Sequence, residues 1–195
     1  MAVVILASVP RIYTGTGDDG STGLLFGGRI SKADPVTEAA GAIDEAVAAL
    51  GVARALGDDP STRAGILDLQ RALFVVGADL ATNPAERDRL EPGVSRVTAD
   101  MSEGLEARID ALVTDHPLPN AFIVPGANPM SASLDVARGA VRRAERRVVA
   151  VMVADGFVNA DLRRYLNRLS DLLFVMARVA AGEAEPLSRA ADAEA

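Results

Sequence analysis

Apolar residues recur three and four positions apart in five separate stretches of this 195-residue sequence, which is the spacing of one buried helix face. Polar turn residues and prolines separate the stretches. The pattern predicts helices over residues 35–56, 61–83, 99–116, 130–154 and 160–181. Short connections and apolar faces of this kind are typical of an all-α, five-helix bundle.

Capping residues and prolines fix where these helices are expected to begin and end. Asp34 is placed to cap the first helix, with Pro35 in its first turn, and Asn159 caps the last. Ser61 begins the second helix and Pro129 precedes the fourth. Residues 117–126, "PLPNAFIVPG", read as an extended apolar strap between prolines. The expected organisation is an N-terminal arm over residues 1–34, a bundle over 35–181 and an acidic, disordered tail over 182–195.

The arm contains the glycine-rich segment "RIYTGTGDDGSTGLLFGG", residues 11–28, which we expect to form neither a helix nor a regular strand. Glycine, Thr and Ser in such a loop can bring backbone N–H groups close to a phosphate. A flexible arm without a ligand is the alternative, and this segment alone favours it.

Composition removes several classes of function. A net charge of −7 argues against general nucleic-acid binding, and the lack of Cys excludes disulfides and thiolate sites. No apolar run reaches membrane-spanning length, and "AVVILASVP" is short for a secretory signal and has no basic segment before it. We therefore expect a cytoplasmic protein without nucleic-acid or membrane partners. Walker, HExxH and Ser–His patterns are absent from the sequence.

A basic row on the fourth predicted helix is the strongest candidate for ligand chemistry. Arg138 and Arg142 lie four residues apart on one face with Glu145 and Arg146 near them, whereas Arg143 and Arg147 turn away. Arginine forks suit polyphosphates well. A solvated helix face with Arg–Glu pairs is the alternative interpretation.

Polar residues also border the apolar stripes of two other helices. Asp44 lies beside such a stripe, where either Arg138 pairs with it or it faces water with Glu45. Asn167 and Asp171 repeat the pattern on the last helix, where an amide could be a satisfied core group or a ribose ligand. His116, at a helix end, is assigned no chemistry.

Three ordered motifs resemble the PduO-type ATP:cob(I)alamin adenosyltransferases. "RIYTGTGDDGSTGLLFGGRISKAD" is similar to that family's nucleotide loop, and "FIVPGANPMSASLDVARGAVRRAERRVV" to its Pro-Gly-Gly and arginine-rich stretch. "YLNRLSDLLFVMAR" resembles its final-helix signature. The similarity extends over about residues 11–178 and includes "AAGAIDEAVAALG".

The resemblance implies a homotrimeric five-helix bundle with each active site between neighbouring subunits. It places ATP, Mg²⁺ and cob(II)/cob(I)alamin there, with a loop that orders around the triphosphate. The implied ATP-binding loop residues are Thr14, Gly15, Thr16, Gly17, Ser21, Thr22 and Lys32. Arg142 and Arg146 would bind phosphates, Glu145 would organise Mg²⁺ or its waters, and Asn167 would hold the ribose.

The corrinoid side is also assigned by resemblance. Asp44 and Arg138 match an ion pair there, and Phe122 matches the aromatic residue below the corrin. The implied reaction moves the 5′-deoxyadenosyl group of ATP to cob(I)alamin and needs no protein nucleophile. It gives adenosylcobalamin and triphosphate, with a flavin or flavoprotein as reductant and an adenosylcobalamin-dependent mutase as consumer.

Some positions depart from the family pattern. Gly15 stands where a basic residue is usual, Ala127 and Asn128 replace a Gly-Ser/Thr continuation, and Asp135 replaces a His. Gly139 replaces a frequent Thr. These departures leave two alternatives to an active enzyme: a non-catalytic adenosylcobalamin-binding or delivery protein of the same fold, and an unrelated helical adaptor.

Overall fold

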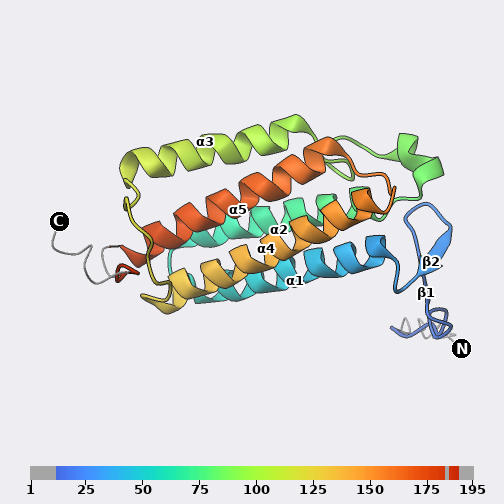
Figure 1. Ribbon diagram of the computed structural model, residues 1–195, viewed down its shortest axis with the longest axis horizontal. Helices are drawn as coiled ribbons and strands as arrows, with labels where there is room; N and C mark the ends of the chain where they lie inside the picture. The colour runs from blue at the N-terminus through green and yellow to red at the C-terminus, as the bar shows by residue number, and fades with distance from the viewer. Residues whose placement is uncertain (1–11, 183–184, 189–195) are drawn as a thin grey trace, which may run out of the picture.

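Five long α-helices lie side by side in the computed structural model, which describes residues 12–182 and 185–188 (Figure 1). The first 11 residues, including "AVVILASVP", fall outside the described part, as do 183–184 and 189–195. The helices are α1 (Pro35–Leu56), α2 (Pro60–Leu80), α3 (Ala99–Asp115), α4 (Pro129–Val153) and α5 (Ala160–Ala181), with a 3₁₀ helix η1 (Pro84–Arg89) after α2. The predicted all-α bundle is confirmed.

Helix starts follow the local capping chemistry. Asp34 accepts a hydrogen bond from the Val36 amide at 2.8 Å and begins α1 as predicted. The second helix begins one residue earlier than predicted, because Asp59 rather than Ser61 is its cap. Asp59 accepts from the Thr62 amide at 2.7 Å and from the hydroxyls of Ser61 and Thr62, and these hydrogen bonds lower the pKa of its carboxyl.

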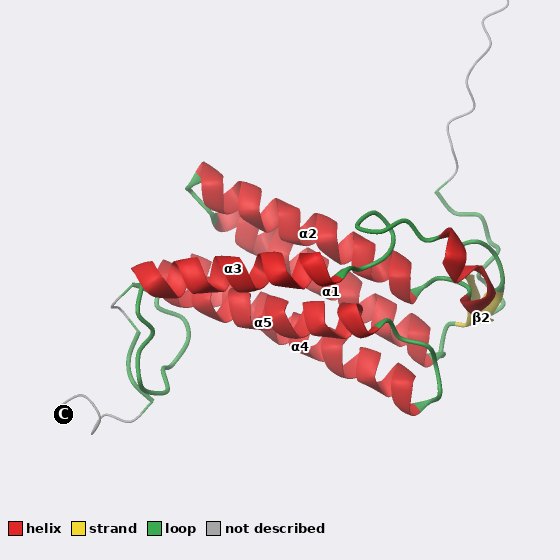
Figure 2. Cartoon of the chain, turned by 90° about the horizontal axis from the view of Figure 1, so that it is seen from above, coloured by secondary structure: helices red, strands yellow, loops and turns green. Residues whose placement is uncertain are grey.

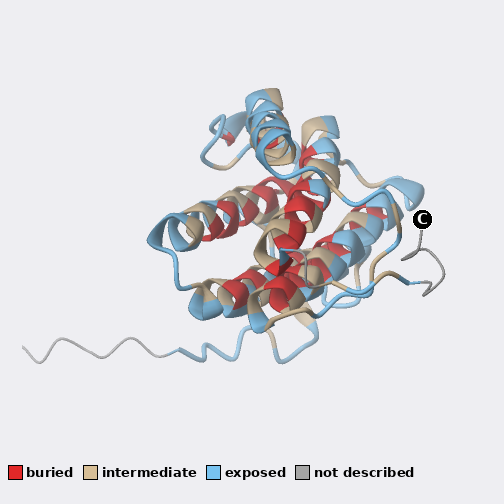
Figure 3. Ribbon diagram, turned by 90° about the vertical axis from the view of Figure 1, so that its left-hand side faces the viewer, coloured by how far each residue is buried: buried red, intermediate tan, exposed pale blue. Residues whose placement is uncertain are grey.

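The most extensive helix contact, between α1 and α4, contains many alanines. Buried alanines line α1 at positions 39, 42, 46 and 53 and α4 at positions 137, 140 and 144. Such small side chains let two helix backbones approach closely. Leucines of α5 fill the space between α4 and α3, and the buried residues face inward in Figure 3. This packing fixes the α4 and α5 faces that carry the candidate residues.

A buried polar network closes the end of the bundle where α2 stops. The Asp79 side chain is 1% exposed and pairs with Arg87 of η1. It also accepts from the Val97 amide at 2.9 Å and from Asn159 Nδ2 at 2.7 Å. Asn159 is at the same time the cap of α5. One carboxylate therefore joins α2, η1, the following loop and α5.

A short β-hairpin corrects the expectation that residues 11–28 hold no regular strand. Strand β1 (Ser21–Gly23) pairs antiparallel with β2 (Arg29–Ser31), in register Thr22 with Ile30. Gly27 and Gly28 adopt positive φ and turn the chain between the strands. Leu25 bonds to Ala81 and Asn83 through its backbone, so the hairpin is docked on the end of α2.

The strap between α3 and α4 lies at the opposite end of the bundle from the hairpin (Figures 1 and 2). Residues 117–126 have no helix, as predicted. Within the segment expected to be a disordered tail, residues 185–188 lie against the strap, where Leu187 forms an antiparallel bridge with Ile123. Among the described residues, no helix combines the length and apolar character needed to cross a bilayer.

Candidate functional site

The basic row on α4 divides into two sets by the partners available to each arginine. Arg143 pairs with Glu45 and Arg147 with Glu38, both on α1, as expected for residues that turn away from the row. Arg142 and Arg146 are exposed, and within the described part of the chain neither has an ion-pair partner. Two guanidinium groups on α4 are therefore available to an anion.

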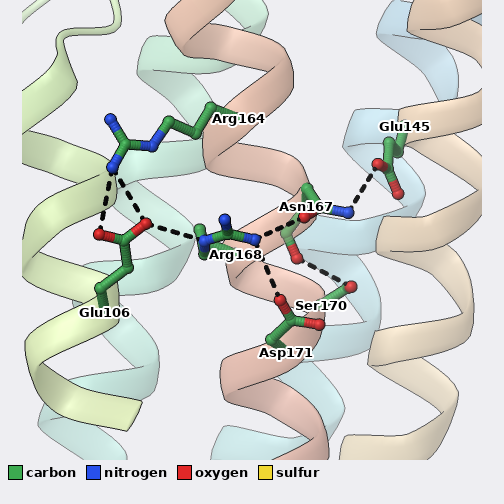
Figure 4. Close-up of polar contacts among 7 residues, drawn as sticks. All are labelled: Glu106, Glu145, Arg164, Asn167, Arg168, Ser170 and Asp171. Carbon is green, nitrogen blue, oxygen red and sulfur yellow. Dashed lines mark hydrogen bonds and ion pairs between the residues drawn. The ribbon is translucent and has the colours of Figure 1, made fainter. Parts of the chain in front are cut away.

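Glu145 of α4 and Asn167 of α5 face each other between the two helices (Figure 4). Asn167 Nδ2 donates to Glu145 Oε1 at 3.1 Å, and Asn167 Oδ1 accepts from Arg168 at 2.7 Å. Both ends of the amide thus have a partner, which fixes its orientation. The structure thus places Glu145 of α4 and Asn167 of α5 in direct contact.

Arg168 connects this pair to α3, a role that sequence reasoning missed. Its Nε donates to Glu106 Oε1 at 2.8 Å, and Arg164 donates to both Glu106 oxygens at 3.1 Å (Figure 4). Hydrogen bonds from Arg168 and Arg164 lower the pKa of the Glu106 carboxyl. The same contact raises the pKa of Arg168. The chain Glu106–Arg168–Asn167–Glu145 therefore spans α3, α5 and α4.

A cavity of about 710 Å³ opens between α3, α5, the start of α4 and the strap. Arg138, Arg168 and Phe174 lie along its wall, and Phe122 from the strap contributes a ring that is 87% exposed. The cavity is large enough for a drug-sized or larger ligand, and it reaches the Arg168 end of the polar chain.

Arg138 does not pair with Asp44 within this chain, contrary to one sequence-based alternative. Its guanidinium lies over the Phe174 ring of α5, 5.3 Å from the centroid, and its Nε is buried without a hydrogen-bond partner among the described residues. Asp44 is exposed on α1. The two separate because α4 presents Arg138 to α5, whereas the ion pairs of α4 with α1 are made by Arg143 and Arg147. In the single chain Asp44 faces water, as the other alternative expected.

The glycine-rich loop is braced from inside by two basic residues. Lys32 Nζ donates to the Gly17 carbonyl at 2.7 Å, and Arg29 donates to the Thr16 carbonyl and to Ser21 Oγ. A Cβ on Gly17 would lie 3.1 Å from Lys32 Nζ, so glycine suits this close approach. Arg29 was not identified from the sequence, although it is the first residue after the Gly27–Gly28 turn.

Within one chain the loop and the α4 face remain apart. Thr14 bonds to Thr16 at 2.8 Å, and Gly15 has a positive φ of 71°. The hydrogen bonds made by loop residues 14–22 all stay within the hairpin region of the described chain. The structure thus places Glu145 and Asn167 in contact, with Arg142 and Arg146 near Glu145 on α4, and places Arg138 and Phe122 on one cavity. The loop lies at the end of the bundle opposite that cavity (Figure 1).

Two departures from the family pattern have structural reasons in this chain. Asn128 caps α4 through the Ser131 amide at 2.9 Å and also donates to the Ala180 carbonyl of α5 at 2.7 Å. Asp135 pairs with buried Arg178 of α5. Both residues therefore join the start of α4 to the end of α5 beneath the strap. For Gly139, nothing in the structure explains the substitution.

Metal-binding potential at the site is limited to single carboxylates. Among the described residues, no cluster of three or more His, Cys, Asp or Glu side chains is placed to hold a metal ion. Magnesium bound to a nucleotide takes most of its ligands from phosphates and water and needs only one or two carboxylates. The half-buried Glu145 fits that requirement.

Comparison with known proteins gives consistent matches over nearly the whole chain. The family model described as cobalamin adenosyltransferase matches residues 12–180. A corrinoid adenosyltransferase of Mycobacterium tuberculosis (strain H37Rv) is 43% identical over 182 residues, covering 92% of this chain and 93% of that protein. One from Citrobacter freundii is 41% identical over 169 residues, covering 87% and 94%.

Solved structures agree with these sequence matches. A variant PduO-type ATP:corrinoid adenosyltransferase from Lactobacillus reuteri, complexed with cobalamin and ATP, is 32% identical with a TM-score of 0.82. The match covers 92% of this chain and 99% of that one. A second variant of the same enzyme, complexed with ATP, is also 32% identical with a TM-score of 0.80, covering 91% and 100%.

Proposed function

The chain belongs to the cobalamin adenosyltransferase family, and from that premise we propose how its residues carry out ATP-dependent adenosyl transfer to a corrinoid. In this reaction the Co(I) lone pair attacks C5′ of ATP and forms the Co–C bond. The C5′–O bond breaks, and its electron pair leaves with triphosphate. The protein supplies no covalent nucleophile, so its contribution is positioning and electrostatic stabilisation.

Arg142 and Arg146 are proposed to bind the ATP phosphates. Both are exposed, and neither is neutralised by an acidic partner in the described chain, unlike Arg143 and Arg147. The leaving triphosphate gains negative charge, so fixed guanidinium groups beside it lower the barrier. Glu145 is positioned to take a magnesium ion or its waters, which would supply further charge neutralisation of the leaving group.

Asn167 is proposed to hold the ribose. Its amide orientation is fixed by Glu145 on one side and Arg168 on the other. A ribose hydroxyl that approached this amide would meet a preoriented donor and acceptor. The neighbouring Glu145 would then lie between ribose and phosphates, as a residue that organises the metal should.

Phe122 is proposed to cover the lower face of the corrin. Its ring is exposed at the mouth of the 710 Å³ cavity, which gives it freedom to meet a large planar ligand. An apolar ring in the lower axial position would exclude water and the axial base. Cob(II)alamin would then become four-coordinate, which eases its reduction to the nucleophilic Co(I) form.

The remaining residues are proposed to act between protomers of a homotrimer. Among the described residues, the loop hydrogen bonds stay within the hairpin region and none reaches Arg142 or Asn167, so we propose that loop residues Thr14, Gly15, Thr16, Gly17, Ser21, Thr22 and Lys32 reach the α4 face of a neighbour. Exposed Asp44 and the unpaired Nε of Arg138 would likewise meet across this interface. A flavin or flavoprotein reductant and an adenosylcobalamin-dependent mutase are proposed as partners.

One observation carries most of this proposal: the cavity that the exposed Phe122 ring borders is also lined by Arg168, which holds the Asn167 amide. The direct test is incubation with ATP, Mg²⁺ and chemically reduced cobalamin, followed by absorbance spectroscopy. The spectrum of adenosylcobalamin should develop. Tight corrinoid binding without that spectrum would indicate a delivery protein instead.

A further inference from the structure

The Phe122 strap is held in place by residues from the far end of the chain. The Ser188 amide donates to the Phe122 carbonyl at 2.7 Å, and the Val124 amide donates to the Pro186 carbonyl at 2.8 Å. These two bonds form the antiparallel bridge between Ile123 and Leu187. One of them is made by the backbone of Phe122 itself.

Few other contacts fix the strap. Among the described residues, the hydrogen bonds to Ser188 and Pro186 are the two that residues 117–127 make. The next anchors are the ends of the neighbouring helices, at His116 and Asn128. Segments with few hydrogen bonds open at low free-energy cost. The position of the Phe122 backbone therefore depends strongly on residues 185–188.

The C-terminal segment is in turn anchored to the cavity wall. The side chains of Glu185 and Arg178 are each 5% exposed, and Glu185 Oε2 lies 2.6 Å from Arg178 Nε. Arg178 also pairs with Asp135 of α4 and lies 4.9 Å from the centroid of the Phe174 ring. Asp135, Phe174 and Arg178 all line the cavity that Phe122 borders.

We propose that residues 185–188 form a latch that positions Phe122 over the corrinoid, so that the C-terminal segment controls access to the lower axial face. The latch residues are positioning residues, and this role rests on the proposed function of Phe122. A released strap would let water or the axial base return to cobalt. The step from cob(II)alamin would then slow, whereas transfer from preformed cob(I)alamin would continue.

Two truncations of the full chain test the latch. A chain that ends at residue 184 lacks it, and a chain that ends at residue 188 retains it and serves as the matched control. With ATP bound, electron paramagnetic resonance should show that the shorter chain loses at least 80% of its four-coordinate cob(II)alamin signal. Its turnover from cob(II)alamin should fall about tenfold or more, while turnover from cob(I)alamin stays within threefold. The control should match the full chain in all three measurements.

Single substitutions at Ser188 separate the latch from effects of truncation. Ser188→Pro removes the amide that donates to Phe122, and Ser188→Ala keeps it. We expect Ser188→Pro to lower the four-coordinate signal and Ser188→Ala to leave it unchanged. Equal signals in the full chain, in the chain ending at residue 184 and in Ser188→Pro would overturn the latch.

The Phe122→Ala variant distinguishes a failure of the latch proposal from a failure of the proposed function. If Phe122→Ala abolishes the four-coordinate signal but removal of the latch does not, only the latch is wrong. If Phe122→Ala leaves the signal intact, the proposed role of Phe122 is wrong and the latch has no function to serve. The shorter chain could instead lose turnover equally from cob(II)alamin and from cob(I)alamin and bind ATP more weakly. That result would also contradict a positioning role.

Discussion

The side-chain amide of Asn167 donates a hydrogen bond to Glu145 Oε1 at 3.1 Å, which joins α5 to α4 at the centre of the candidate nucleotide site. The two residues have different proposed tasks, ribose binding and organisation of magnesium. Their contact nevertheless makes them one unit, because Arg168 holds the other end of the Asn167 amide. Substituting each residue in turn can separate the two tasks.

Glu145→Gln should raise the Mg²⁺ concentration needed for half-maximal activity, because an amide oxygen is a weaker magnesium ligand than a carboxylate. Asn167→Ala should instead weaken ATP binding and leave the Mg²⁺ requirement close to that of the unchanged chain. Steady-state rates measured across Mg²⁺ and ATP concentrations would show both effects. An identical shift of both parameters in the two variants would contradict the division of roles.

Arg142→Ala should weaken ATP binding by about 1.5–3 kcal/mol, the usual effect of losing a hydrogen bond to a charged group. Arg143→Ala is the matched control, since Arg143 is adjacent on α4 but pairs with Glu45 of α1. Calorimetric titration with ATP should show a loss in the first variant and little change in the second. A similar loss in both would mean that general charge, rather than the position of Arg142, attracts the nucleotide.

Phe122→Ala should slow the reaction that starts from cob(II)alamin far more than the reaction that starts from chemically produced cob(I)alamin. The side chain lies outside the hydrophobic core, with 87% of its surface exposed, so its removal should leave thermal stability nearly unchanged. The two activity assays and a melting curve form one experiment. Equal losses in both assays would contradict a role at the lower face of the corrin.

Asp79→Ala should lower the free energy of unfolding by about 3–5 kcal/mol, because it leaves Arg87 and two buried donors without their acceptor. Asp68→Ala removes an acid from an exposed pair with Arg71 and should cost about 0–1 kcal/mol. Urea unfolding of the two variants makes the comparison. A cost at Asp79 no larger than that at Asp68 would show that the network contributes little to stability.

The latch should weaken as pH rises. Burial raises the pKa of the Glu185 carboxyl; Arg178 opposes this rise, and Asp135 adds to it. The docked segment therefore holds a proton more tightly than the released segment does. The docked state is therefore most stable below the ordinary pKa of glutamate, and its stability declines as the pH rises through the raised pKa of Glu185. Hydrogen-exchange protection of the Val124 amide, corrected for intrinsic exchange rates, should follow this decline.

Glu185→Gln is the control for that pH dependence, because its side chain does not titrate. Asp115 and His116 line a second cavity together with Glu185 and Arg178, and Asp135 contacts Arg178 directly. If the Gln variant retained the same pH dependence, one of these groups rather than Glu185 would be responsible.

The helices could be predicted from the sequence because each has a local signal. Asp34, Asn159 and the prolines after the caps mark the helix starts, and apolar spacing marks the buried faces. The hairpin was missed because strands of three residues have too few positions to show alternation. Only the Gly27–Gly28 pair, a turn signal, could have indicated it.

The candidate site was predictable only where neighbours in sequence are neighbours in space. Arg142, Glu145 and Arg146 share one helix, so their spacing alone places them on one side. Asp44 and Arg138 lie on different helices, and whether they meet within one chain depends on how α4 is rotated against α1 and α5, which the sequence does not show. The sequence contained no indication that Glu185 is buried. Its burial depends on the ion pair with Arg178, near the end of α5, and the direction in which the chain continues after that helix could not be predicted.

The buried alanines between α1 and α4 have a consequence for how this enzyme can evolve. Methyl groups at positions 39, 42 and 46 of α1 and 137, 140 and 144 of α4 set the separation of the two helix axes. Arg142 and Arg146 are exposed on the outer side of the same α4 helix, so they move with it as a rigid body. Enlarging a buried alanine, for example Ala140→Val, would displace both arginines without changing either of them. Selection on the position of these arginines can therefore act through methyl groups buried on the opposite side of the helix.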